Sequence, residues 1–278
     1  MLARNPDLHC HSTVSDGLLS PRDLVARAVA HEVDLLALTD HDELAGLSDA
    51  REAADAAGLR FVNGVEISVS WGEQTLHIVG LGFDAAHPPL VEGLAQVRSG
   101  RDERAERMGA ALAQIGIRGA YEGALKYVGN PALVSRSHFA RYLVEIGVAR
   151  DVKSVFDHYL VRGKPGYVEH DWASLEDALS WIHGAGGLAV IAHPGRYRLS
   201  NDELEKVFAR FRDLGGDAIE VVSGSQGREC TLGFARVARR YGFLASRASD
   251  FHGPLESATD IGCADPLPED LIPVWSHL

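Results

Sequence analysis

Cysteine is scarce in this sequence, and long apolar runs are absent. The three cysteines, Cys10, Cys230 and Cys263, lie far apart and show no CxxC spacing, so the sequence predicts neither a disulfide framework nor a zinc ribbon. No run of about 18 apolar residues could span a bilayer, and the first residues lack the apolar core of a signal peptide. We therefore expect a cytoplasmic protein of a reducing compartment.

Basic charge is also in short supply. The chain has 27 Lys and Arg against 39 Asp and Glu, a formal net charge of -12. Non-specific nucleic-acid binding depends on clustered lysines and arginines, so this balance argues against a general polyanion-binding surface. A small anionic substrate held by a few arginines or metal ions remains compatible with it. Apolar residues make up 46% of the chain, an ordinary share for a globular protein that builds a large core.

Short apolar segments alternate with helical patterns along most of the chain. The helix predicted at 20–32 begins with Ser20 as N-cap and Pro21 at the first helical position, a recognised start signal. Such alternation is typical of βα units around a parallel sheet. The predicted strands are 6–9, 33–40, 60–69, 75–83, 188–193, 218–223 and 243–250, and further helices are predicted at 173–187 and 200–216.

The alternation stops between about residues 85 and 170, where helical patterns follow one another without an evident strand. An insertion of this length after the fourth strand would lie above one mouth of a barrel, as a candidate lid. We therefore predict a first part of the barrel at 1–84, a helical insertion that binds substrate at 85–170, and a second part of the barrel at 171–278.

Every predicted strand carries or ends in an ionisable side chain. In α/β barrels, functional groups lie at the C-terminal ends of the strands and in the loops that follow. His9 and His11 are two residues apart, as are Asp250 and His252, so each pair points to one side of an extended chain. The full set is His9, His11, Asp16, Asp40, His41, Asp42, Glu66, His77, His193, Glu220, Asp250 and His252.

Imidazole and carboxylate groups together suit borderline divalent metals such as Zn, Mn or Fe. A single strand histidine is more often a core or surface residue than a ligand, but ligand types on all seven strands are hard to obtain by accident. The set is too large for one ion, and clustered ions are a standard solution for displacement at phosphorus. We therefore predict two or three ions per chain. Cys10 should point away from His9 and His11, so we do not expect a cysteine nucleophile.

Six motifs resemble those of one known family, in its order and across nearly the whole chain. They are DLHCHS (7–12), TDHD (39–42), GVEIS (64–68), HIVGLGFD (77–84), AHPGRY (192–197) and SDFHG (249–253). With them the sequence resembles the PHP (polymerase and histidinol phosphatase) superfamily. The resemblance implies an α/β fold, a distorted (β/α)7 barrel with a helical insertion after the fourth strand. It also implies two or three divalent ions, with Mn as first choice and Zn, Fe or Mg as alternatives.

The resemblance also implies a ligand set. The positions that match are His9, His11, Glu66 and Asp250 for one ion, with Glu66 bridging to a second ion held by His77 and His193, and Asp16, His41 and His252 for a third. Asp40, Asp42 and Glu220 are left as carboxylates that orient histidines, or as plain polar groups.

The helical insertion, with SRSHFAR (135–141) and RGKPGYV (162–168), resembles the stand-alone branch of the superfamily that acts on nucleotides. This implies hydrolysis of the 3'-phosphate of nucleoside 3',5'-bisphosphates and 5' to 3' trimming of short 5'-phosphorylated RNA, by attack of a metal-bridging hydroxide on phosphorus. Asp250, His193 and His138 are the candidate proton-transfer groups. We expect no membrane, no duplex DNA and no obligate protein partner.

Phosphate recognition needs forked hydrogen-bond donors, which arginine supplies. Arg196 follows the fifth strand and should lie at the barrel mouth, while Arg136 and His138 in the insertion could descend with the lid. Tyr197 is a candidate for stacking on a base. The alternative for the two arginines and His138 is a solvated helix face.

Two other functions compete with this one. A histidinol phosphate phosphatase, or another small-molecule phosphomonoesterase, would use the same metal motifs and differ in the lid. A non-catalytic PHP module that binds partners would be expected to lose ligands, and none of the nine is missing here.

Overall fold

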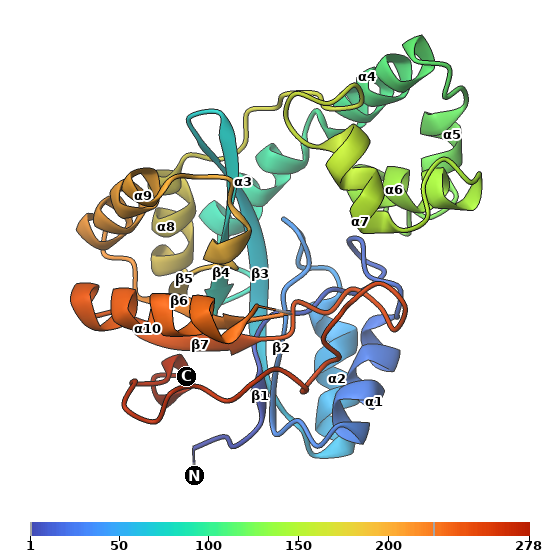
Figure 1. The fold of residues 1–278 in the computed structure, drawn as a ribbon. Helices are drawn as coiled ribbons and strands as arrows, with labels where there is room; N and C mark the ends of the chain where they lie inside the picture. Colours follow the sequence, from blue (N-terminus) through green and yellow to red (C-terminus); the bar gives the residue numbers. More distant parts are fainter. Residues whose placement is uncertain (1, 225) are drawn as a thin grey trace.

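Seven strands form one sheet at the centre of the molecule (Figure 1). The computed structural model describes residues 2–224 and 226–278, and the strands follow one another around the sheet in chain order. They are β1 (Pro6–Asp7), β2 (Leu35–Leu38), β3 (Arg60–Trp71), β4 (Gln74–Leu81), β5 (Leu188–Ile191), β6 (Ala218–Ser223) and β7 (Leu244–Ala248). The seven predicted strands and the distorted barrel are confirmed.

The sheet is nearly closed, because the segment after β1 meets the segment after β7. The amide of Asp250 donates to the carbonyl of His9 over 2.9 Å, and that of His11 donates to Phe251 over 2.8 Å. Two ligand-bearing segments from opposite ends of the chain therefore lie side by side at one end of the barrel.

The expected parallel arrangement is wrong for one strand, because β4 runs antiparallel to both β3 and β5. Trp71 pairs with Gln74, so only Gly72 and Glu73 connect β3 to β4, and a two-residue loop leaves no room for a crossover helix. This reversal places the beginning of β4, rather than its end, beside the C-terminal ends of the parallel strands. His77 therefore reaches the same end of the barrel as the other predicted ligands.

Helices cover the outside of the barrel. They are α1 (Pro21–Ala30), α2 (Leu47–Ala57), α3 (Pro88–Arg98), α8 (Leu175–Gly184), α9 (Asn201–Asp213) and α10 (Arg228–Tyr241). The side chain of Ser20 accepts a hydrogen bond from the amide of Asp23 at the start of α1, which confirms the predicted cap. None of the helices in the described part of the chain combines the length and apolarity that crossing a bilayer requires.

The insertion forms a separate helical unit at the upper right of Figure 1. It comprises α4 (Arg101–Gln114), α5 (Ala120–Leu125), α6 (Arg136–Glu145), α7 (Val152–Val155) and a π-helical turn at Phe156–Leu160. Its buried side chains, including Met108, Phe139 and Leu143, form a hydrophobic cluster of their own. By contrast, Leu90 and Leu94 of α3 belong to the barrel core, so the predicted boundary at residue 85 lies one helix before the second core begins.

Candidate metal centre

The predicted ligands meet at one end of the barrel, although they are spread over most of the chain. Their nitrogen and oxygen atoms form four overlapping groups, and within each group the ligand atoms lie within 4.8 Å of one another. The groups are His11, Asp16, His41 and His252; His9, Glu66 and His193; His9, His11 and Asp250; and His41, Glu66 and His77. All nine residues of the predicted set take part in at least one group.

Backbone geometry at the strand ends is unusual. Asp42, His193 and Asp250 have φ angles of 51°, 27° and 51°, a region that residues other than glycine seldom adopt. Each of these residues lies just beyond β2, β5 or β7. Strained conformations of this kind concentrate at functional sites, where the surrounding structure holds them in place.

Glu66, in the middle of β3, is the common partner of the imidazoles. Its Oε1 atom lies 2.8 Å from His77 Nδ1 and 2.9 Å from His193 Nε2, while its Oε2 atom lies 2.7 Å from His41 Nδ1. Burial favours the neutral carboxyl, but the neighbouring imidazoles of His77, His41 and His9 outweigh it and hold the pKa of Glu66 well below its usual range. A carboxylate whose two oxygens face different imidazoles has the arrangement expected of a ligand that bridges two metal ions.

The donor atoms fit divalent cations. Several are buried and have no hydrogen-bond partner among the described residues: His11 Nδ1, Asp16 Oδ1, His193 Nδ1 and Asp250 Oδ1. In addition, His9 Nε2 faces His11 Nε2 at 3.1 Å. Buried polar atoms normally have hydrogen-bond partners. Imidazole nitrogens and carboxylate oxygens that converge on one place are the donor atoms that Mn, Fe and Zn accept.

Of the three remaining carboxylates, Glu220 contacts two of the predicted ligands. Glu220 Oε1 lies 2.6 Å from His9 Nδ1, and its Oε2 atom accepts the backbone amide of His193 over 2.6 Å. The Nδ1 proton of His9 is thereby fixed and its Nε2 atom is left for the centre, the arrangement common behind metal-bound histidines. Asp40 accepts hydrogen bonds from Ser12, and Asp42 accepts them from Ser68.

The protonation states of most ligands favour metal binding. Burial opposes ionisation of Asp16, but His41 and His252 outweigh it and hold the pKa of Asp16 well below its usual value. Burial lowers the pKa of His252 to about 4. His41 and His9 differ. Although burial opposes their charge, Glu66 and Asp16 raise the pKa of His41 to about 9, and Glu66 and Glu220 raise that of His9 well above its usual value. A cation would have to displace a proton from each of them.

Arg196 and Tyr197, predicted to bind substrate, both lie beside the centre. A guanidinium nitrogen of Arg196 contacts Asp250 Oδ2, and about half of the arginine side chain is exposed, so it remains accessible to a ligand. The hydroxyl of Tyr197 donates to the carbonyl of Ala192 over 2.8 Å and accepts the amide of His77 over 2.9 Å. Tyr197 therefore fastens β4 to the end of β5.

The insertion reaches the centre through the start of α6. The hydroxyl of Ser135, the N-cap, donates to Asp16 Oδ2 over 3.1 Å. The amide of Ser135 donates to His138 Nδ1 over 3.0 Å, so the ring proton of His138 is on Nε2. That Nε2 atom is buried and has no hydrogen-bond partner in the described part of the chain. Arg136 is half-buried, and its guanidinium lies 5.6 Å from the ring of Phe156.

Several contacts between the insertion and the barrel were not predicted from the sequence. Arg141 of α6 donates to both carboxylate oxygens of Glu256, over 2.7 and 2.8 Å. Arg101, the first residue of α4, forms an ion pair with Asp42. The stretch RDER at 101–104 resembles an exposed helix start in sequence, and only the presence of four charges in a row could have drawn attention to it.

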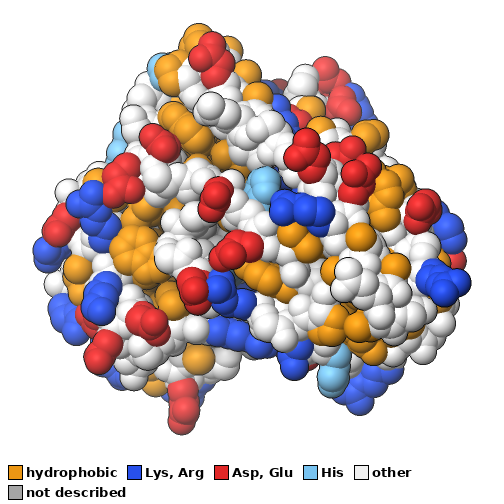
Figure 2. All heavy atoms as spheres, turned by 90° about the horizontal axis from the view of Figure 1, so that it is seen from above, with side chains coloured by type: hydrophobic (Ala, Val, Ile, Leu, Met, Phe, Trp, Pro, Cys, Tyr) orange, Lys and Arg blue, Asp and Glu red, His pale blue; other side chains and the backbone are white. Residues whose placement is uncertain are grey.

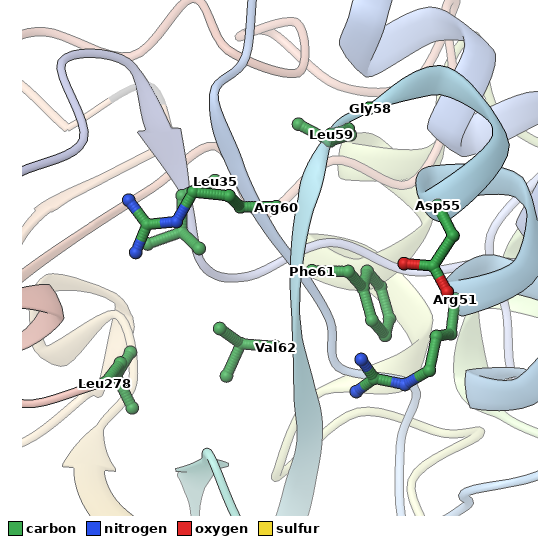
Figure 3. A pocket seen from close by; sticks show the side chains of 9 residues that line it. All are labelled: Leu35, Arg51, Asp55, Gly58, Leu59, Arg60, Phe61, Val62 and Leu278. Carbon is green, nitrogen blue, oxygen red and sulfur yellow. The ribbon is translucent and has the colours of Figure 1, made fainter. Parts of the chain in front are cut away.

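Other surfaces offer less chemistry than this centre. Acidic and basic side chains are interspersed on the face seen from above (Figure 2). A pocket of about 530 Å³ lies at the opposite end of the barrel, where β2 and β3 begin. Figure 3 shows Arg60 and Leu35 on one side of β3 and Phe61, Arg51 and Asp55 on the other. With one carboxylate and no imidazole among its lining residues, this pocket does not resemble a metal site.

Replacing Cys10 with serine should leave kcat within about threefold of the wild type, since an exchange that touches no reacting group costs well under one kcal/mol of transition-state binding. The thiol is fully buried and contacts the carbonyl of Ala37 at 3.2 Å. Burial and the carboxylates of Asp7, Asp40 and Asp250 raise its pKa well above the usual value, so it is not a nucleophilic thiolate. Steady-state kinetics on a phosphate ester check this, and loss of activity with folding intact would restore Cys10 as a nucleophile.

Comparison with known proteins gives the site its context. A model of the PHP domain matches residues 7–217. The 3',5'-nucleoside bisphosphate phosphatase of Chromobacterium violaceum is 52% identical over 99% of this chain and 96% of its own length. The 5'-3' exoribonuclease Rnm of Salmonella typhimurium is 46% identical over 89% and 85% of the two chains. A solved structure from Bifidobacterium adolescentis, described as a metal-dependent phosphoesterase, has a TM-score of 0.79 and 29% identity over 96% and 92%.

Proposed function

Because this chain belongs to the PHP domain family, we propose that it is a metal-dependent phosphoesterase that removes the 3'-phosphate from nucleoside 3',5'-bisphosphates. The same activity would release mononucleotides from the 5' end of short 5'-phosphorylated RNA. The observation that carries the proposal is the centre around Glu66. One carboxylate oxygen of Glu66 contacts two imidazoles, and the other oxygen contacts a third. The activities named for the Chromobacterium and Salmonella relatives supply the substrate class.

The nine ligands would hold two or three ions, and we propose manganese, with zinc, iron and magnesium as alternatives. Divalent ions bound here would lower the pKa of water toward neutrality and withdraw charge from a phosphate group. The contacts group the ligands in a slightly different way from the family pattern. His11 joins Asp16, His41 and His252, and His41 also joins Glu66 and His77. His9, His11, His41 and Glu66 each belong to two of the four groups, so these residues would hold neighbouring ions close together.

The remaining site residues would bind and orient the substrate. Arg196 can donate to the oxygens of the reacting phosphate with the donors that Asp250 does not use, because charge-assisted hydrogen bonds from arginine suit phosphate geometry. His138 presents an Nε2 proton and can act only as a donor in this state. Asp250, which is ion-paired with Arg196, and His193 are the candidate proton acceptors.

A substrate panel in manganese buffer tests the proposal. We expect adenosine 3',5'-bisphosphate to yield inorganic phosphate and adenosine 5'-monophosphate, and a 5'-phosphorylated oligoribonucleotide to yield mononucleotides. Histidinol phosphate is the matched comparison, since it needs the same metal centre but offers no second phosphate. Equal or greater kcat/KM for histidinol phosphate would overturn the proposed substrate and favour a small-molecule phosphomonoesterase.

A further inference from the structure

Asp16 and His252 lie in irregular chain beyond the strands. Asp16 belongs to the loop between β1 and α1, and His252 belongs to the segment that follows β7. Glu66 and His77, by contrast, lie within β3 and β4, where the paired backbones of the two strands fix their positions. Loop residues are less constrained than residues of the elements that they connect. Since Asp16 and His252 share one group of converging donors, that group needs support from outside the sheet.

Arg141 of α6 contacts both of these irregular segments. Its side chain is only 5% exposed. The guanidinium donates from Nε and Nη2 to the two carboxylate oxygens of Glu256, and Nη2 also donates to the backbone carbonyl of Asp16. A paired arginine–carboxylate contact fixes geometry as well as charge. One guanidinium of the insertion therefore joins the loop of Asp16 to the segment that follows β7.

The contact with Glu256 extends to His252 through a short turn. The amide of His252 donates to the hydroxyl of Ser257 over 2.7 Å, so the chain folds back on itself between these two residues. The carbonyl of His252 accepts the amide of Leu18, in the loop of Asp16, over 2.7 Å. Because the two segments are bonded to each other, a side chain that holds Glu256 also restrains His252.

The insertion meets the loop of Asp16 at two further points. The hydroxyl of Ser135 donates to Asp16 Oδ2. A β-carbon at Gly129 would lie 2.2 Å from the carbonyl oxygen of Thr13, so the backbone of the insertion passes directly against this loop. Elsewhere the support differs: among the described residues, no hydrogen bond or ion pair joins the helices of the insertion to the ligands Glu66, His77 or His193.

We propose that Arg141 is a positioning residue for one metal ion. It ties the helical insertion to Asp16 and His252, and so sets the affinity of the ion that these two ligands help to hold. The inference rests on the metal centre of the proposed function. Removing a residue that supports metal ligands typically costs about 10- to 100-fold in metal affinity. The donors around Glu66 depend much less on Arg141, and the insertion is thus a structural part of one ion site.

A manganese titration tests the inference without substrate. Chelator-treated wild type and variants are titrated in a calorimeter, and bound ions are counted by elemental analysis. Arg141→Met should bind one ion about 10- to 100-fold more weakly and should keep the affinity for the other ions. Arg141→Lys retains the charge but not the paired contact, so its affinity should lie between the two. Arg150→Met is the matched control: the side chain of Arg150, also in the insertion, is 87% exposed and pairs with its neighbour Asp151.

The pattern of affinities separates positioning from a general structural role. Wild-type affinities for every ion in Arg141→Met, or an equal loss for every ion, would overturn the inference. Circular dichroism checks the fold of each variant. Glu256→Gln gives the same test if Arg141→Met does not fold, because it keeps the size of the partner side chain and removes its charge. It should weaken the same single ion, and unchanged affinities would count against Arg141 in that case.

Failure of the inference and failure of the proposed function give different results. If the wild type binds manganese and the Arg141 variants bind it equally well, the inference alone fails. If Arg141→Met loses affinity for one ion while the wild type hydrolyses neither nucleotide, the inference stands and the proposed function fails. A wild type that binds no manganese would overturn both.

Discussion

Asp250→Asn should lower kcat for the bisphosphate by at least about 1,000-fold, because several kcal/mol of charge stabilisation depend on an intact metal site and each 1.36 kcal/mol is tenfold in rate. Asp250 Oδ1 lies 3.5 Å from His9 Nε2 and 3.3 Å from His11 Nε2, while Oδ2 contacts Arg196. Asparagine removes the negative charge and replaces one carboxylate oxygen with an NH2 group. This NH2 group would face either a bound cation or Arg196, and both repel it.

The control for this variant is Asp270→Asn, which changes an exposed carboxylate paired with Arg239 on the surface. It should retain wild-type kinetics. Circular dichroism and metal analysis of both proteins distinguish loss of the site from loss of the fold. If Asp250→Asn kept a tenth or more of the wild-type kcat, Asp250 would be neither a ligand nor a necessary partner of Arg196.

Removing bound metal should lower the melting temperature of the wild type by roughly 8–16 °C. A ligand at about 1,000 times its Kd stabilises the folded state by about 4 kcal/mol, and each kcal/mol shifts the melting temperature of a chain of this size by roughly 2–4 °C. The physical source is the set of buried donors without partners, such as His11 Nδ1, Asp16 Oδ1 and Asp250 Oδ1.

Differential scanning fluorimetry with a chelator, followed by addition of manganese, measures this shift. Manganese should restore the wild type fully, and it should restore Asp250→Asn only in part because fewer ligands remain. A melting temperature that does not respond to chelator and manganese would mean that the nine residues are satisfied without a cation.

More of the candidate site than of the surrounding fold could be predicted from the sequence. Strand ends are visible in sequence because short buried strands are continuous apolar runs, so His9, His41, His193 and Asp250 could be identified as neighbours. Their mutual geometry follows from one rule, that such ends converge at one mouth of a barrel. The direction of β4 was missed although the Gly72–Glu73 connection was in view, because the regular alternation elsewhere favoured a crossover.

The burial of Arg101 and Arg104 could not be predicted, because burial is a property of the assembled chain. Arg101 and Arg104 stand in a charged run typical of a solvated helix face, but the ring of Trp172, in the segment that returns from the insertion to the barrel, lies over both guanidinium groups. The boundary of the insertion was obscured for a related reason. α3 is helical in sequence like the helices after it, and its place on the barrel is decided by packing against α8, where Gly93 meets Trp181.

A manganese titration of chelator-treated protein tests the central claim most directly, with bound ions counted by elemental analysis and phosphate release from adenosine 3',5'-bisphosphate measured on the same samples. Glu66, His9, His11 and His41 each belong to two groups of potential ligands. We therefore expect activity to rise only as a second ion binds and to reach its maximum with two or three ions per chain. Full activity with fewer than two ions per chain would contradict a clustered metal centre.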